Sequence, residues 1–207
     1  MSDLSKILIE IEEGRNLDKH IKNENSEVRI VIARYGHCLD VLVHDKDPLV
    51  RAAVARQRYG LDILVHDKDP YVREAVAKQG YDLNVLIKDK STWVRAAVAK
   101  QGYGLGILIH DKSENVRAAV ARQGYGLETL VHDKDPWVRI AVAEQGYGLD
   151  ILANDKDPVI RDYAIEQLKL NKHIQNETFE EKLDRLERMA QPESHNTSLE
   201  LAKEQER

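Results

Sequence analysis

The sequence is poor in cysteine and in long apolar runs, and each deficit excludes a class of protein. Cys38 is the single cysteine among 207 residues, which excludes an internal disulfide framework and any multi-cysteine metal or iron–sulfur site. No stretch approaches the roughly 18 consecutive apolar residues of a membrane-spanning helix. The apolar part of the stretch from Met1 to Glu10 is too short and too acidic for a signal peptide. Together these features predict a cytoplasmic protein with no membrane segment.

An excess of basic residues is also missing. Lys and Arg total 31 and Asp and Glu total 36, which gives a net charge of -5. Proteins that bind duplex nucleic acid usually carry a basic excess or a basic stripe, because they must neutralise phosphates. The composition therefore disfavours nucleic acid as the partner.

What the chain does have is an internal repeat, marked by a hydrophobic residue followed by arginine. The pair recurs every 22 residues without an insertion. Its seven occurrences are Val28-Arg29, Val50-Arg51, Val72-Arg73, Val94-Arg95, Val116-Arg117, Val138-Arg139 and Ile160-Arg161.

Each unit carries signals for a helix of about ten residues. A residue suited to N-capping, whose side-chain oxygen can accept a backbone N–H bond, stands three positions before each Val or Ile of the pair. These residues are Asn25, Asp47, Asp69, Ser91, Ser113, Asp135 and Asp157. An Ala/Val-rich run follows, and in most units a glycine then suits the left-handed position past a helix end. Arg58 stands in the glycine position of the second unit, so we expect a strained or different cap there.

The rest of each unit has room for only one short helix. In Leu61–His66, Leu61, Leu64 and Val65 share one helical face, and so short a segment can be α-helical or 3₁₀. The alanines let neighbouring helices approach closely, and no period-2 alternation supports a strand. The sequence therefore predicts an all-α solenoid of seven 22-residue repeats, each one α-helix plus a short α or 3₁₀ helix.

The pattern Leu-x-x-Leu-x-x-Asp-x-Asp-Pro-x-Val-Arg-x-Ala-Val-Ala resembles the HEAT-like and leucine-rich-repeat-variant families, over roughly residues 16 to 170. The resemblance implies a right-handed alpha-alpha superhelix of short helix pairs that serves as an interaction scaffold. Leucine-rich-repeat-variant proteins pair an α-helix with a 3₁₀ helix, which suits a 22-residue unit. The N-terminal iron–sulfur cysteines of one member of that family have no counterpart in this chain.

Four segments follow from these patterns. Residues 1–14 are predicted as an N-terminal capping helix, with Leu4, Ile7, Leu8 and Ile11 on one face, and residues 15–172 as the repeat array. A capping box at Thr178 and Glu181 predicts a C-terminal capping helix within 173–191. Residues 192–207 are predicted to be a polar, disordered tail.

One position varies while its surroundings repeat, and we call it the variable row. It lies directly before each hydrophobic-Arg pair and reads Leu49, Tyr71, Trp93, Asn115, Trp137 and Val159. Because Trp and Tyr dominate interface hot spots, the variable row is the candidate partner-binding surface, with Leu49, Tyr71, Trp93, Asn115 and Trp137 as its main residues. The alternative is that these side chains pack against the start of the neighbouring helix.

A second recurring position forms a basic ladder of Arg34, Arg56, Lys78, Lys100 and Arg122, which ends in Glu144 and Glu166. A basic stripe could bind an acidic partner, including a nucleic-acid backbone, and solvated helix surface is the alternative. The reversal to glutamate and the equal numbers of basic and acidic residues in 16–170 argue against nucleic acid.

The remaining ladders are predicted to be structural. The arginines of the repeated pair match an acidic ladder of Asp45, Asp67, Asp89, Asp111, Asp133 and Asp155, and the two are expected to form ion pairs that fix the stacking of units. His44, His66, His110 and His132 recur about 10 Å apart, too far to share a metal. Tyr59, Tyr81, Tyr103, Tyr125 and Tyr147 are expected to seal the gaps between units.

No catalytic constellation stands out, since the chain has no glycine-rich phosphate loop, nucleophile elbow or His-Glu-x-x-His motif. We therefore predict a protein that is not an enzyme, with no cofactor and no metal. Its function would be that of a protein-protein interaction scaffold, as a monomer or weak homo-oligomer. Two alternatives stay open: a nucleic-acid-binding HEAT-like protein, or a small inhibitory or self-assembling protein from a mobile element or phage.

Overall fold

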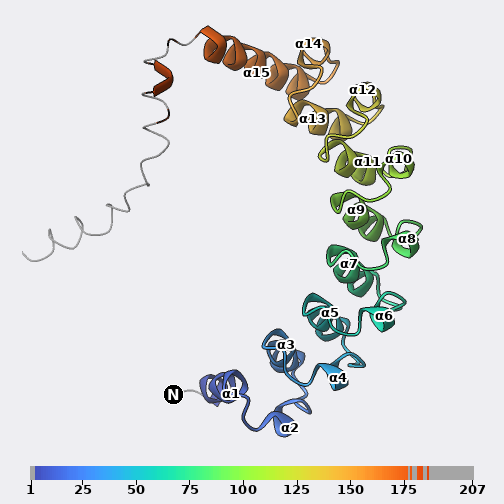
Figure 1. The fold of residues 1–207 in the computed structure, drawn as a ribbon, viewed down its shortest axis with the longest axis vertical. Coiled ribbons are helices and arrows are strands. Elements are labelled where there is room, and N and C mark those ends of the chain that lie inside the picture. The colour runs from blue at the N-terminus through green and yellow to red at the C-terminus, as the bar shows by residue number, and fades with distance from the viewer. Residues whose placement is uncertain (1–2, 177, 179–180, 184–185, 187–207) are drawn as a thin grey trace, which may run out of the picture. The chain divides into compact units, whose positions relative to one another are not determined.

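The structure, a computed structural model, describes residues 3–176, 178, 181–183 and 186. This part of the chain is helical throughout and contains no strand. It falls into two units, Met1–Ala164 and Ile165–Arg207. The repeats lie in the first unit, in which consecutive helices pack in a regular series (Figure 1). The fold class is thus an alpha solenoid, as the sequence predicts.

Each repeat contributes one long and one short helix. The long helices are α3 (Ser26–Arg34), α5 (Pro48–Arg56), α7 (Pro70–Lys78), α9 (Thr92–Lys100), α11 (Glu114–Ala121), α13 (Pro136–Glu144) and the beginning of α15 (Pro158–Asn176). The short helices are α2 (Leu17–His20), α4 (Leu39–Leu42), α6 (Leu61–Leu64), α8 (Leu83–Leu86), α10 (Leu105–Leu108), α12 (Leu127–Leu130) and α14 (Leu149–Leu152). The long helices pack on one another in one row, and each short helix contacts only the long helices before and after it (Figure 1).

The core lies between these two rows. Valines and alanines of the long helices, such as Val94 and Ala99, are fully buried, and the short helices from α4 to α14 each add a buried leucine, such as Leu108. Small side chains at the long-helix contacts allow close helix packing. Each short helix has an α-helical centre, and i→i−3 bonds at its end, such as the one from His110 N to Ile107 O, tighten its last turn.

Most of the predicted N-caps form, but two do not. The side chains of Asn25, Asp47, Asp69, Asp135 and Asp157 each accept a hydrogen bond from the backbone two residues on. The N-cap serines Ser91 and Ser113 occupy the predicted positions but make no side-chain cap bond, so the prediction for these two bonds is wrong. The N–H of each serine donates to the aspartate two residues earlier, a bond that the N–H groups of Asp47, Asp69 and Asp135 also make in the capped units.

The cap at Arg58 is strained, as expected from the missing glycine. Arg58 has a φ of 61°, a left-handed conformation that costs a residue with a Cβ about 1–2 kcal/mol. The corresponding glycines in other units, such as Gly80 at 73°, adopt it without that cost. A second left-handed position, which the sequence did not reveal, precedes each short helix.

At the N-terminal end, α1 (Asp3–Glu12) packs on α2 and α3. Its Ile11 is fully buried, whereas Leu8 is exposed on the predicted apolar face. The buried ring of His20, which stands where later short helices have leucine, bonds Glu10 of α1 at 2.7 Å. That hydrogen bond lowers the pKa of the Glu10 carboxyl.

At the C-terminal end, the predicted capping box forms. Thr178 and Glu181 exchange hydrogen bonds, with the Thr178 N–H donating to the Glu181 carboxylate at 2.8 Å and the Glu181 N–H donating back to Oγ1. Most of the predicted capping helix in 173–191 and the whole of the predicted tail lie outside the described residues.

Candidate functional site

The variable row occupies the second residue of the long helices, directly after the first helical residue. The N-cap aspartates hold the backbone at this point, since Asp47, Asp69 and Asp135 accept bonds from Leu49, Tyr71 and Trp137. The backbone is thereby fixed while the side chain projects outward.

Most side chains of the variable row face solvent. Trp93 is 65% exposed and Trp137 is 68% exposed, which is high for tryptophan because its large apolar surface is normally covered. Leu49, Asn115 and Val159 are also exposed, and Tyr71 is half-buried. Most of the surface of each tryptophan is therefore left uncovered by the neighbouring helices.

The basic ladder occupies the C-terminal ends of the same helices. Arg34, Arg56, Lys78 and Lys100 end their helices and Arg122 follows α11, and all five are exposed. Each lies seven residues after the variable-row position of its own helix. Seven residues are two turns, so the two positions share one side of the helix.

The structure also brings the two rows together across neighbouring units. The Arg56 guanidinium of α5 donates to the Tyr71 hydroxyl of α7 at 2.6 Å and lies 5.2 Å from the centre of the tyrosine ring. By repetition, Lys78 precedes Trp93 and Arg122 precedes Trp137 at the same spacing of fifteen residues. The variable row and the basic ladder thus form one surface, which we call the aromatic-basic face.

The residue three positions after each tryptophan is apolar and partly exposed: Ala96 follows Trp93, and Ile140 follows Trp137. Some of the charge is neutralised within the face, because Lys78 pairs with Glu74 at 2.6 Å and Arg122 with Glu144 at 3.0 Å. These pairs are partly solvated and contribute no more than about 1 kcal/mol each.

The arginines of the repeated pair form the predicted ion pairs, and the geometry is the same in six units. Arg95 donates from Nε and Nη2 to the two carboxylate oxygens of Asp111 at 2.6 and 2.8 Å, and from Nη1 to the Asp89 carbonyl at 2.8 Å. Asp89 in turn accepts both bonds from Arg73. Each loop aspartate is therefore held by two successive arginines, one through its carboxylate and one through its carbonyl. We call this chain of contacts the Arg–Asp ladder.

Burial and ion pairing shift the pKa values of these aspartates in opposite directions. Burial raises the pKa of Asp111, but the hydrogen bonds from Arg95 and from the Ser113 N–H outweigh it, so the pKa lies below its usual value. The hydrogen bond to Asp111 also raises the pKa of Arg95. Both groups stay charged at neutral pH, which fits the structural role predicted for them.

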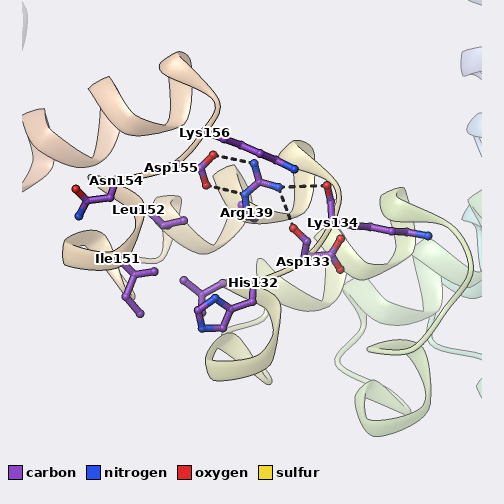
Figure 2. A pocket seen from close by; sticks show the side chains of 10 residues that line it. His132, Asp133, Lys134, Arg139, Ile151, Leu152, Asn154, Asp155 and Lys156 are labelled. Atoms are coloured by element: carbon purple, nitrogen blue, oxygen red, sulfur yellow. Dashed lines mark hydrogen bonds and ion pairs between the residues drawn. The ribbon is translucent and has the colours of Figure 1, made fainter.

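Shallow cavities recur along the edge where the Arg–Asp ladder lies. One of about 320 Å³ is lined by His132, Lys134, Arg139, Asn154 and Lys156, among others (Figure 2). Figure 2 shows the donors of Arg139 directed to Asp155 and to the loop carbonyls. The strongest hydrogen-bonding group at this cavity is therefore already used within the fold. Among the described residues, no cluster of three or more His, Cys, Asp or Glu could hold a metal ion.

Two exposed rows escaped the sequence-based prediction. Six lysines, each directly after an aspartate of the Arg–Asp ladder, are exposed along the loop edge: Lys46, Lys68, Lys90, Lys112, Lys134 and Lys156. Their strict recurrence was a signal that could have found them. Five short helices also expose an aliphatic side chain: Val41, Ile63, Val85, Ile107 and Ile151. Nothing in the composition of a four-residue apolar helix indicates which of its side chains faces outward.

Known proteins offer no further guide to this surface. No protein family, no functionally characterised protein and no solved structure matches the chain. In the part of the chain that the structure describes, no helix combines the length and the apolar character needed to cross a bilayer.

Proposed function

We propose that this protein is a non-enzymatic scaffold that binds a protein partner through the aromatic-basic face. The observation that carries the proposal is the exposure of Trp93 and Trp137 on helices whose valines are fully buried. Leaving two indole rings in water has no structural benefit in the array. A partner that covers them would gain about 1.5–3 kcal/mol for each large side chain buried.

The composition of the face supports protein rather than a small ligand. Aromatic residues and arginine are enriched at the centres of protein interfaces, and charged side chains at the rim fix the register of the partner. The tryptophans lie two units apart, on α9 and α13, so a partner that contacts both must span about 20 Å. A folded surface or a helix of that length meets the requirement.

The regular array supports the scaffold part of the proposal. We propose that the chain is a HEAT-like or leucine-rich-repeat-variant protein, because a 22-residue unit with one nine-residue helix and one four-residue helix suits those families. Arrays of this kind present extended surfaces in which one position per unit can vary without changing the packing of its neighbours.

The test compares the wild-type protein with the double variant Trp93→Ala/Trp137→Ala. Peptides selected from a displayed random library on the wild-type protein serve as the probe, and their binding is measured by fluorescence anisotropy. We expect the double variant to bind at least about a hundredfold more weakly, because a hot-spot residue contributes about 2 kcal/mol or more. Its helical circular dichroism should stay unchanged, since both side chains are exposed.

The matched control is His66→Ala/His132→Ala, which removes two exposed rings from the loop edge and should leave binding intact. Equal binding by the tryptophan variant and the wild-type protein would overturn the proposal. An oligonucleotide that binds the wild-type protein with a steep salt dependence, lost on Arg34→Ala/Lys100→Ala, would favour the nucleic-acid alternative.

A further inference from the structure

A second exposed apolar surface lies on the row of short helices. Each short helix uses its fourth residue and the one after it to contact the core, as with Leu108 and Ile109, while its second and third residues face solvent. The third residue is aliphatic in five units, and Ile107 is 67% exposed. This row consists of Val41, Ile63, Val85, Ile107 and Ile151, and Thr129 interrupts it on α12.

A tyrosine of the turns reaches the same layer. A Cβ placed on Gly106 of α10 would lie 3.2 Å from the Tyr125 hydroxyl, so the ring from one unit reaches the short helix of the preceding unit. The five turn tyrosines are about 40% exposed, as Tyr125 at 44% illustrates. The exposed aliphatic row thus forms an apolar strip with aromatic surface nearby, of the kind that marks an interaction surface.

Acidic residues border this strip. The second residue of the short helices is exposed and reads Asp40, Asp62, Asn84, Gly106, Glu128 and Asp150. We call the strip and its carboxylates the aliphatic-acidic face. It lies on the layer of short helices, whereas the aromatic-basic face lies on the layer of long helices (Figure 1).

We propose that the aliphatic-acidic face of one molecule binds the aromatic-basic face of a second copy of this chain. Charge complementarity supports this occupant. The aliphatic-acidic face carries exposed carboxylates such as Asp40 and Asp150, and the aromatic-basic face carries exposed cations such as Arg34 and Lys100. Opposite charges steer two surfaces together, so this pairing brings both opposite charges and apolar side chains into contact.

Both faces repeat once in every 22-residue unit. Each molecule therefore offers several contact points of the same kind on either face.

Because the two patches differ, the contact is heterologous and leaves one free face of each kind on every dimer. Such contacts do not close by twofold symmetry and can extend to longer assemblies. The inference rests on the proposed function, since it names a second copy as one occupant of the aromatic-basic face. Self-association then competes with any other protein for Trp93 and Trp137.

The test is sedimentation velocity of the full chain over a range of concentrations at low salt. We expect the weight-average mass of the wild-type protein to rise with concentration and to fall on adding salt. One variant, Trp93→Ala/Trp137→Ala, removes the aromatic-basic contacts. The other, Ile63→Lys/Ile107→Lys, removes the aliphatic contacts and adds charge of the repelled sign. Each alone should associate at least about tenfold more weakly than the wild-type protein.

Mixing the two variants is the decisive step. Each retains the face that the other has lost, so an equimolar mixture should recover a complex of two chains, and that complex should not grow further. Thr129→Lys is the matched control, because it places the same charge in the row without removing an aliphatic side chain. If the lysine variant loses helical circular dichroism, Ile63→Thr/Ile107→Thr replaces it, since α12 carries threonine at that position.

A wild-type protein that stays monomeric at all concentrations would overturn the inference. So would association that both variants lose and the mixture fails to restore, because a twofold-symmetric contact behaves in that way. Peptide binding distinguishes the two proposals. If the protein is monomeric but still binds peptides through its tryptophans, only the self-association is refuted. If it neither self-associates nor binds peptides through its tryptophans, the proposed function is refuted as well.

Discussion

Cutting the Arg–Asp ladder at its centre should destabilise the array far more than removing a surface ion pair. Arg95 is 6% exposed, and its guanidinium makes two bonds to the Asp111 carboxylate and further bonds to the Asp89 and Lys90 carbonyls. The side chains of the ion pair are 8% and 9% exposed. Removing one partner of a buried pair leaves the other charged and without compensation, which costs about 3–5 kcal/mol.

We therefore expect Arg95→Met, which keeps most of the side-chain volume, to lower the free energy of unfolding by about 3–5 kcal/mol. Asp111→Ala should cost a similar amount. The double variant should lose less than the sum by about 2–3 kcal/mol, because no uncompensated charge remains. Urea titration followed by circular dichroism gives all three values. Amide hydrogen exchange should place the loss between α9 and α11, since units of an array contact only their neighbours.

The control is Arg122→Ala, which breaks an ion pair of similar length between side chains that are 46% and 41% exposed. Solvent screens such a pair, so the loss should be about 1 kcal/mol or less. If Arg95→Met and Arg122→Ala lower the free energy of unfolding by the same amount, burial does not determine the strength of these contacts. The description of the Arg–Asp ladder as the element that joins the units would then be refuted.

Three further changes test the local physics. The pKa values of the ladder aspartates are lowered by the arginines, so the stability they contribute should be complete above about pH 4, the unfolded value. This contribution to stability should fall as the pH drops through the pKa values of the folded state. Urea midpoints that stay constant below about pH 4 would contradict this. Arg58→Gly removes a left-handed strain and should raise the free energy of unfolding by about 1 kcal/mol, whereas Gly80→Ala at the same position of the next unit should lower it by a similar amount. Ser91→Asp supplies the cap bond that the serine does not make and should stabilise α9 by about 0.5–1 kcal/mol; thermal melts that show no gain would contradict a missing cap bond at Ser91.

The repeat itself was predictable because its signals are local. A capping residue and, in most units, an Ala/Val-rich run follow one another, with proline after the cap in four units, and their 22-residue period places every helix without information from elsewhere in the chain. The missing bonds at Ser91 and Ser113 could not be predicted in the same way. Serine carries its single oxygen directly on Cβ, so the χ1 rotamer alone decides whether that oxygen faces the helix.

The candidate site was less predictable because it depends on contacts between units. The variable row and the basic ladder are seven residues apart, and their union on one face also requires Arg56 to reach Tyr71 across the gap between α5 and α7. The exposed aliphatic row could not be read at all. In Leu105–Leu108 the third residue is as apolar as the fourth, and only the docking of the short helix decides that Ile107 faces water while Leu108 is buried.

The buried positions that recur in the repeats pack the units together, whereas most positions that vary between repeats are exposed, which explains how such a surface can change. The Arg–Asp ladder, the buried valines and the alanines hold the units together, and none of them lies at an exposed position of either face. Exchanging Trp93 or Ile107 should therefore have little effect on the stability of the array. Arg56 has two roles, because it ends α5 and also donates a hydrogen bond to Tyr71. Under the proposed function, binding specificity follows from the few residues that the packing does not use.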